Sequence, residues 1–265
     1  MPSPRVLLLH NRYRVEGGEE RSLELQAAAL EHAGVEHRVL ERSSGDAGRV
    51  RAARALLRGG EREDEVATAV RELGAGVVHA HNMQPLFGPR ALAAAREAGA
   101  RVVLHLHNVR LFCAIGVASR DGGPCFRCHH RQTVPGLVLN CRDSVPEAAV
   151  YAAALPLQQR RVFEVVDRFV APSRYAVGQL ATLGVPRDGL EVLPHYLPAD
   201  AFADGSHSGR GTYALVAGRL SEEKGVDVAI EAAARARVPL RVAGDGPAAA
   251  RRSSSAASGG ARWLL

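Results

Sequence analysis

Two pairs of histidines close two short apolar segments of the chain. His79 and His81 end the segment GVVHAH, and His105 and His107 end the segment RVVLHLH. If both segments are strands, alternation along the backbone places the two members of each pair on the same side. Imidazole side chains ligate zinc-like ions, and they also serve as hydrogen-bonding groups of the core. The pairs therefore leave a metal centre and a metal-free site open.

His107 is the candidate catalytic residue, because it comes last in its segment and polar side chains follow it at once. Asn108 and Arg110 come after His107, and Asn82 directly follows the other histidine pair. In open α/β sheets, ligands bind outside the carboxyl ends of the strands. These side chains are therefore expected to line a substrate cleft.

Gly17 and Gly18 precede a helical stretch after the first apolar segment. Paired glycines at a helix start let a ligand approach the backbone, whose free N–H groups can face an anion or a sugar hydroxyl. A tight turn explains the pair equally well, since the three-glycine dinucleotide fingerprint is missing. A cleft position and a plain turn both stay open for these glycines.

Lys224 is the only lysine of the chain, although lysine and arginine together number 34. With Arg219 it flanks a turn between an apolar segment and a helix that begins near Gly225. Two cations beside a helix N-terminus suit a diphosphate, and they stabilise the charge of a departing phosphate. Ordinary surface charge is the alternative, but a phosphate site that needs a compact point charge explains why lysine is kept.

All four cysteines fall within one loop-like region. Cys125 and Cys128 form a Cys-x-x-Cys pair, with Cys113 upstream and Cys141 downstream. Four thiolates in this order predict a tetrahedral structural zinc site that orders a long loop. Free thiols, a redox disulfide, or a neighbouring histidine in place of one thiol are the alternatives.

The segments that carry these residues alternate between strand-like and helical patterns. Between two apolar runs, Leu23, Ala27 and Leu30 share one helical face, and Gly34 then caps the helix. Runs typical of buried parallel strands cover residues 5–10, 37–40, 76–81, 101–107, 168–173 and 190–194. This rhythm predicts an α/β fold with a Rossmann-like, doubly wound parallel sheet.

A second, shorter series of elements follows a polar stretch. We expect a first domain over 1–195, a linker over 196–211 and an incomplete second domain over 212–265. The second domain holds one strand–helix–strand unit, which is too small to bury both faces of a sheet. Its final segment, AAARRSSSAASGGARWLL, lacks the spaced large apolar side chains of an amphipathic helix. A shifted reading frame in a GC-rich gene would produce such a composition.

Composition excludes several classes of protein. A hydrophobic fraction of 46% and a charged fraction of 23% are those of a soluble globular protein. The net charge of +6 comes from arginines that form no tract, so we expect no nucleic-acid partner but some affinity for anionic lipid or phosphate. No run approaches the ~20 apolar residues of a membrane span, which predicts a cytoplasmic chain. The affinity for anionic lipid leaves peripheral contact at the inner membrane face open.

Together the motifs resemble those of family 4 glycosyltransferases with the two-Rossmann-domain, GT-B architecture. The resemblance spans residues 5 to about 247 and rests on EGGEE, VVHAHN, LHNVRLFC, FVAPSRYA, VLPHYLP, VAGRLSEEKGVDVAIEA and RVAGDGP. It implies an N-terminal domain for a saccharide or lipid-linked acceptor of the cell envelope and a C-terminal domain for a nucleotide-sugar donor. It also implies retention of configuration, with no metal or other cofactor at the reaction centre.

The resemblance also implies roles for single residues. It places the paired glycines in the cleft and His107 beside the reacting sugar and the acceptor hydroxyl. It assigns Arg219 and Lys224 to the donor diphosphate, and Gly244 and Gly246 to the border of the base pocket. His195 is a departure, because many relatives have asparagine there.

The end of the chain departs further from the resemblance. Relatives continue beyond the GDGP turn to a Glu-x7-Glu segment that contacts the donor sugar and ribose, and this chain shows no such segment. We therefore expect a truncated donor domain, weak donor binding and little turnover by this chain alone. A metal-dependent hydrolase that uses the histidine pairs, and a non-catalytic acceptor-binding domain, are the two alternative functions.

Overall fold

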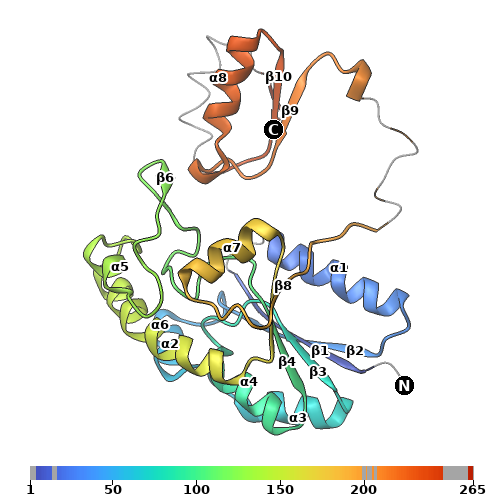
Figure 1. Ribbon diagram of the computed structural model, residues 1–265, viewed down its shortest axis with the longest axis vertical. Helices are drawn as coiled ribbons and strands as arrows, with labels where there is room; N and C mark the ends of the chain where they lie inside the picture. The colour runs from blue at the N-terminus through green and yellow to red at the C-terminus, as the bar shows by residue number, and fades with distance from the viewer. Residues whose placement is uncertain are drawn as a thin grey trace. The chain divides into compact units, whose positions relative to one another are not determined.

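The computed structural model describes residues 4–13, 17–198, 201, 205, 208–246 and 262–264. It divides the chain into two compact units (Figure 1). The first unit comprises Met1–Ala118 and Cys125–Pro198, and the second comprises Ser119–Pro124 and Ala199–Leu265. Residues 199–200, 202–204 and 206–207 of the expected linker, and most of the final segment, lie outside the described residues.

The first unit is built on a six-stranded, fully parallel sheet in the order β2-β1-β3-β4-β7-β8. The strands are β1 (Val6–Arg12), β2 (His37–Ser43), β3 (Val77–Ala80), β4 (Arg101–His105), β7 (Arg168–Ala171) and β8 (Leu190–Val192). From β1 the chain passes outward to β2 and then returns to β3 on the other side of β1. The topological switch point therefore lies between β1 and β3, where ligands bind in such sheets.

Helices cover both faces of this sheet because β1 buries alternate side chains on each. Leu7 and Leu9 join the main core cluster, whereas Val6 and Leu8 pack with Leu23 of helix α1 (Gly18–His32). The remaining helices are α2 (Arg49–Arg58), α3 (Glu63–Leu73), α4 (Gly88–Glu97), α5 (Val134–Val138), α6 (Val145–Val165) and α7 (Arg174–Leu183). The predicted doubly wound sheet is confirmed.

Helix α1 (Gly18–His32) shows how the sequence positions the first loop. Glu20 accepts hydrogen bonds from the backbone N–H groups of Tyr13 (3.1 Å) and Gly17 (2.9 Å), which satisfies donors that a helix start leaves open. Leu23 is buried, and Ala27 and Leu30 pack beside it as the helical pattern predicts. The loop after β1 is thereby tied to the start of α1.

The second unit holds a three-stranded parallel sheet in the order β11-β10-β9. Strand β9 (Ala214–Ala217), the short 3-10 helix η3 (Glu222–Lys224), helix α8 (Val226–Ala236) and strand β10 (Leu240–Ala243) follow the expected strand–helix–strand series. Strand β11 (Arg262–Leu264) lies in the segment for which the sequence predicted no regular element. A small core, Leu220, Val226, Leu240 and Val242, stabilises this unit.

In the described part of the chain, none of the helices combines the length and the apolar character that a membrane crossing needs. Helix α2 is nonetheless strongly basic, since arginine is its only charged residue type, and its Val50 is 83% exposed. Peripheral membrane contact stays a prediction.

Candidate active site

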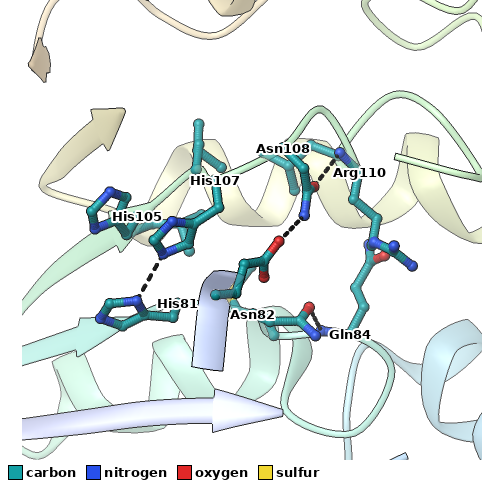
Figure 2. Close-up of a pocket in the computed structure, with 12 residues that line it drawn as sticks. His81, Asn82, Gln84, His105, His107, Asn108 and Arg110 are labelled. Carbon is teal, nitrogen blue, oxygen red and sulfur yellow. Dashed lines mark hydrogen bonds between the residues drawn. The ribbon is translucent and has the colours of Figure 1, made fainter. Parts of the chain in front are cut away.

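A narrow pocket opens at the carboxyl ends of β3 and β4, next to the switch point of the sheet. It is lined by Glu19, His81, Asn82, Met83, Gln84, Leu104, His105, Leu106, His107, Asn108, Arg110 and Leu111. Figure 2 shows the labelled polar members, with His81 and Asn82 following β3 and with His107, Asn108 and Arg110 following β4. The structure thus brings together four residues that the sequence assigned to the cleft and the reaction: His107, Asn82, Asn108 and Arg110.

The histidines form one column of stacked rings. The rings of His105 and His107 lie 3.9 Å apart with an interplanar angle of 14°, and those of His79 and His81 lie 4.8 Å apart at 26°. Each pair therefore shares one side of its strand, as alternation predicts. His195 extends the column, because its ring stacks on His107 with a centroid distance of 5.1 Å. Strand β4 ends at His105, so His107 stands two residues beyond the strand rather than as its last residue.

Burial keeps four rings of this column, those of His79, His81, His105 and His107, uncharged at neutral pH. It lowers the pKa of His79 to about 4, that of His105 to about 3 and that of His107 to about 2, and neighbouring imidazoles lower the last two further. The pKa of His81 falls well below its usual value for the same reasons. A neutral imidazole carries one N–H donor and one lone-pair acceptor, so each ring can both give and accept a hydrogen bond.

The column is arranged for stacking rather than for chelation. Nitrogens of His79, His81 and His105, and of His105, His107 and His195, come within 4.8 Å of one another among the described residues. A metal ion bonded to His105 and His107 must lie in the plane of each ring, but these nearly parallel planes do not meet near either nitrogen. In the first group, both nitrogens of His81 already make hydrogen bonds. This arrangement does not favour the metal-dependent hydrolase.

The side chain of Asn82 forms hydrogen bonds that connect two segments at the pocket. Its side-chain Nδ2 donates to the carbonyl of Asn11 at 2.6 Å, and its Oδ1 accepts from the backbone N–H of Gln84 at 3.2 Å. The backbone N–H of Asn11 in turn donates to the carbonyl of Asn82 at 2.7 Å. These bonds join the ends of β1 and β3, so Asn82 holds the floor of the pocket in place.

Asn108 connects the end of β4 to the start of α1. Its Nδ2 donates to Glu19 at 2.6 Å, and its Oδ1 accepts from the backbone N–H of Arg110 at 2.8 Å. The hydroxyl of Tyr13 donates to the other oxygen of Glu19 at 3.0 Å, and the Arg110 guanidinium lies 4.9 Å from the centre of the Tyr13 ring. Burial raises the pKa of Glu19, although Asn108, Tyr13 and Arg110 oppose that shift.

Glu19 and Gln26 belong to this site, although the sequence patterns alone did not predict either of them. Both belong to α1, and both contact residues after β3 or β4 that are far away in the sequence. A signal for Glu19 was present in the EGGEE motif, whereas Gln26 stands in a run of ordinary helix formers. Gly17 and Gly18 lie exposed at the start of α1, and neither lines the pocket. Their role in a cleft stays a prediction.

The four cysteines gather in one region of the first unit, and none forms a disulfide. Burial raises the pKa of Cys128 to about 11, and the three other cysteines add to that shift. Among the described residues, no three of the sulfur atoms come as close together as the histidine nitrogens do. Zinc binding by Cys113, Cys125, Cys128 and Cys141 stays a prediction.

In the second unit, the turn after β9 presents the two predicted phosphate-binding cations. Arg219 and Lys224 are exposed, and Gly225, with φ of 60°, leads from η3 into α8. The end of β10 packs directly against this turn. A Cβ atom at Gly244 would lie 2.0 Å from the carbonyl oxygen of Gly218, and one at Gly246 would lie 2.4 Å from that of Leu220.

These two glycines therefore allow a close backbone approach that no other residue permits. Two backbone hydrogen bonds close the contact, from Gly218 N–H to Ala243 at 3.0 Å and from Leu220 N–H to Asp245 at 2.8 Å. The cation-bearing turn is consequently held by the segment that carries Gly244 and Gly246.

Comparison with solved structures shows that the chain has the GT-B fold. HepE of Anabaena, in complex with UDP, matches with 14% identity and a TM-score of 0.53 over 98% of this chain and 68% of its own. WaaG, a glycosyltransferase involved in lipopolysaccharide biosynthesis, matches with 15% identity and a TM-score of 0.52 over 98% and 69%. The catalytic domain of starch synthase IV from Arabidopsis thaliana, bound to ADP and acarbose, matches with 12% identity and a TM-score of 0.53 over 99% and 74%.

Residues 17–195 match the family model described as a glycosyl transferase 4-like domain. The chain therefore belongs to this family of transferase enzymes. A comparison with curated protein sequences finds no match.

Proposed function

We propose that this protein transfers a sugar from a nucleotide-sugar to a hydroxyl group of a saccharide or lipid-linked acceptor of the cell envelope, with retention of configuration. The proposal depends on the turn between β9 and α8, where Arg219 and Lys224 are both exposed and Lys224 directly precedes Gly225, the N-cap of α8. Cations beside a helix start bind phosphate groups and stabilise a departing diphosphate. Family membership supports the same reaction.

The donor is proposed to bind the second unit through its diphosphate. Structures of HepE contain UDP or UDP-glucose, and the structure of starch synthase IV contains ADP. UDP and ADP differ in the base and share the diphosphate. The likeness therefore supports a diphosphate grip by Arg219 and Lys224 without choosing the base, and Gly244 and Gly246 are proposed to border the base.

The acceptor is proposed to bind the pocket of the first unit. The pocket presents an imidazole from His107, an amide from Asn108 and a carboxyl group from Glu19, all suited to hydrogen bonds with hydroxyl groups. His107 is uncharged at neutral pH because burial lowers its pKa to about 2. Its proposed role is therefore to orient the sugar and acceptor hydroxyl through neutral hydrogen bonds, with no metal at the reaction centre.

Isothermal calorimetry with UDP and UDP-glucose tests the donor site. Replacing one cation, in Lys224→Gln or Arg219→Gln, removes a charge-assisted interaction of about 1.5–3 kcal/mol, so Kd rises roughly ten- to a hundredfold. Arg235→Gln is the matched control, because Arg235 is exposed in the same unit and pairs with Glu231. Unchanged affinity in both cation variants would refute the assignment.

Retention and metal independence have their own readouts. Proton NMR of any glycoside formed from UDP-glucose gives the anomeric configuration, and an inverted product would contradict retention. Turnover that disappears with EDTA and returns with added divalent metal would contradict a metal-free reaction centre.

A further inference from the structure

The side chain of Gln26 bridges two histidines that lie on the sheet below α1. Its Nε2 lies 2.6 Å from Nδ1 of His79, and its Oε1 lies 2.6 Å from Nε2 of His81. The second ring nitrogen of His81, Nδ1, lies 2.8 Å from Nε2 of His107 (Figure 2). One amide on α1 is therefore linked, through a single imidazole, to the candidate catalytic histidine.

This chain of contacts determines where each proton lies. An amide oxygen can only accept, so His81 must carry its proton on Nε2 to donate to Gln26. Its Nδ1 is then a lone pair and must accept, which requires the proton of His107 to lie on Nε2. In a neutral ring the second nitrogen of His107, Nδ1, is left as a lone pair.

The lone pair on Nδ1 of His107 lies at the end of this series of hydrogen bonds, and Nδ1 is the atom that can contact a ligand. Nδ1 of His107 is buried and makes no hydrogen bond within the described residues, and the His107 side chain lines the pocket. An unpaired buried acceptor costs free energy, and a ligand that supplies a hydroxyl donor removes that cost. His107 is thus presented as an acceptor of a hydroxyl hydrogen bond.

We propose that Gln26 is a positioning residue that acts through His81 to hold His107 as its Nε2-protonated tautomer, with Nδ1 available to a substrate hydroxyl. The inference rests on the proposed function only in naming a sugar or acceptor hydroxyl as the donor. Without Gln26, His81 can carry its proton on either nitrogen, and His107 then mixes both tautomers. The amide thereby sets what kind of hydrogen bond the pocket offers.

Nitrogen-15 NMR of the histidine side chains tests this inference directly on the full chain without any ligand. The His107 signals are assigned by their loss in His107→Gln. In the wild type at pH 7.5, Nδ1 of His107 is expected at the shift of an unprotonated nitrogen and Nε2 at that of a protonated one. In Gln26→Met, both shifts are expected to move toward the average of the two tautomers.

Two further variants separate positioning from simple packing. In Gln26→Glu, measured at pH 8.5 where the imidazoles are neutral, a carboxylate oxygen still accepts from His81, so the wild-type shifts of His107 are retained. Glu24→Gln is the matched control on α1, since Glu24 is exposed and pairs with Arg21. Gln26→Ala replaces Gln26→Met if the latter does not fold.

The outcomes are decisive and independent of transfer activity. A protonated Nδ1 on His107 in the wild type overturns the inference, and so do wild-type His107 shifts in a folded Gln26→Met protein. Averaged shifts in Gln26→Met together with retained shifts in Gln26→Glu support it. Failure of the donor site would appear in the calorimetry with UDP, which leaves these shifts unaffected.

Discussion

At the scale of single residues, the site depends on imidazoles that burial keeps neutral. The nearby groups are His10, which is buried on β1, Glu20, whose Oε1 lies 3.4 Å from His10 Nε2, and His195 at the end of the column. A charged ring would face other rings at 4–6 Å in a low dielectric, which is unfavourable. Protonation of these rings at low pH is therefore expected to destabilise the pocket.

The folded protein is expected to lose stability as pH falls below 6.5. Folding lowers the pKa of four histidines, which are His79, His81, His105 and His107. As pH falls, these rings therefore bind protons in the unfolded chain before they do so in the folded chain. Each ring then removes up to about 1.4 kcal/mol of the free energy of unfolding per pH unit, until pH reaches its folded pKa. The raised pKa of Glu19 makes the folded protein more stable as pH falls, but this single group is outweighed by the four histidines.

Urea denaturation between pH 7.5 and 5 measures this slope. His105→Leu is expected to lower the slope by about one proton, and at pH 7.5 it removes ring nitrogens that have no hydrogen-bond partner among the described residues. His32→Gln is the control, because His32 is exposed at the end of α1. A free energy of unfolding that stays constant over this range would contradict the account of the column.

Local spacing was enough to predict some residues of the pocket and not others. His107, Asn108 and Arg110 follow the same strand within four residues of one another, so their proximity can be predicted from the sequence. Glu19 and Gln26 reach the site because α1 lies across the sheet, and nothing in a local pattern reports that contact. The polar partners contributed by a distant helix were therefore missed.

At the scale of elements, the turn after β9 and the end of β10 pack against each other and hold each other in place. Gly244, with φ of 135°, and Gly246, with φ of 156°, adopt conformations that only glycine adopts readily, directly against the backbone of residues 218–220. The GDGP motif therefore serves the close approach of two strand ends as well as any ligand.

Gly244→Ala is expected to displace the cation-bearing turn. The added Cβ would meet the Gly218 carbonyl oxygen, and backbone strain of this type costs about 1–3 kcal/mol. We expect a lower melting temperature of the second unit and at least tenfold weaker UDP binding. Gly209→Ala is the matched control, since no atom of the described residues lies within 4 Å of its added Cβ. Wild-type affinity in Gly244→Ala would show that the turn does not hold the donor.

The strands were more predictable than the helices. Apolar runs predicted all six strands of the first sheet. The inner strands β1, β3, β4 and β7 are mostly buried and leave that pattern, whereas the edge strands β2 and β8 are mostly half-buried or exposed. Helix α6 contains Pro156 and spreads its apolar residues, so its periodicity is weak. Strand β11 is only three residues long and depends on pairing with β10, which no local pattern reveals.

At the scale of the whole molecule, the GT-B fold is shared with solved structures at 12–15% identity. At that level the architecture is shared, while the substrates must be argued from the residues of this chain. In the proposed function, the pocket of the first unit binds a hydroxyl group, and the turn of the second unit supplies the cations Arg219 and Lys224. We propose that the second unit holds the diphosphate of a nucleotide-sugar.

Hydrogen–deuterium exchange with and without saturating UDP tests this claim most directly. We expect slower exchange of the backbone amides of residues 218–225 and 243–246 in the wild type, and no such protection in Lys224→Gln at the same UDP concentration. Protection confined to the first unit, for example at the arginines of α2, would contradict it.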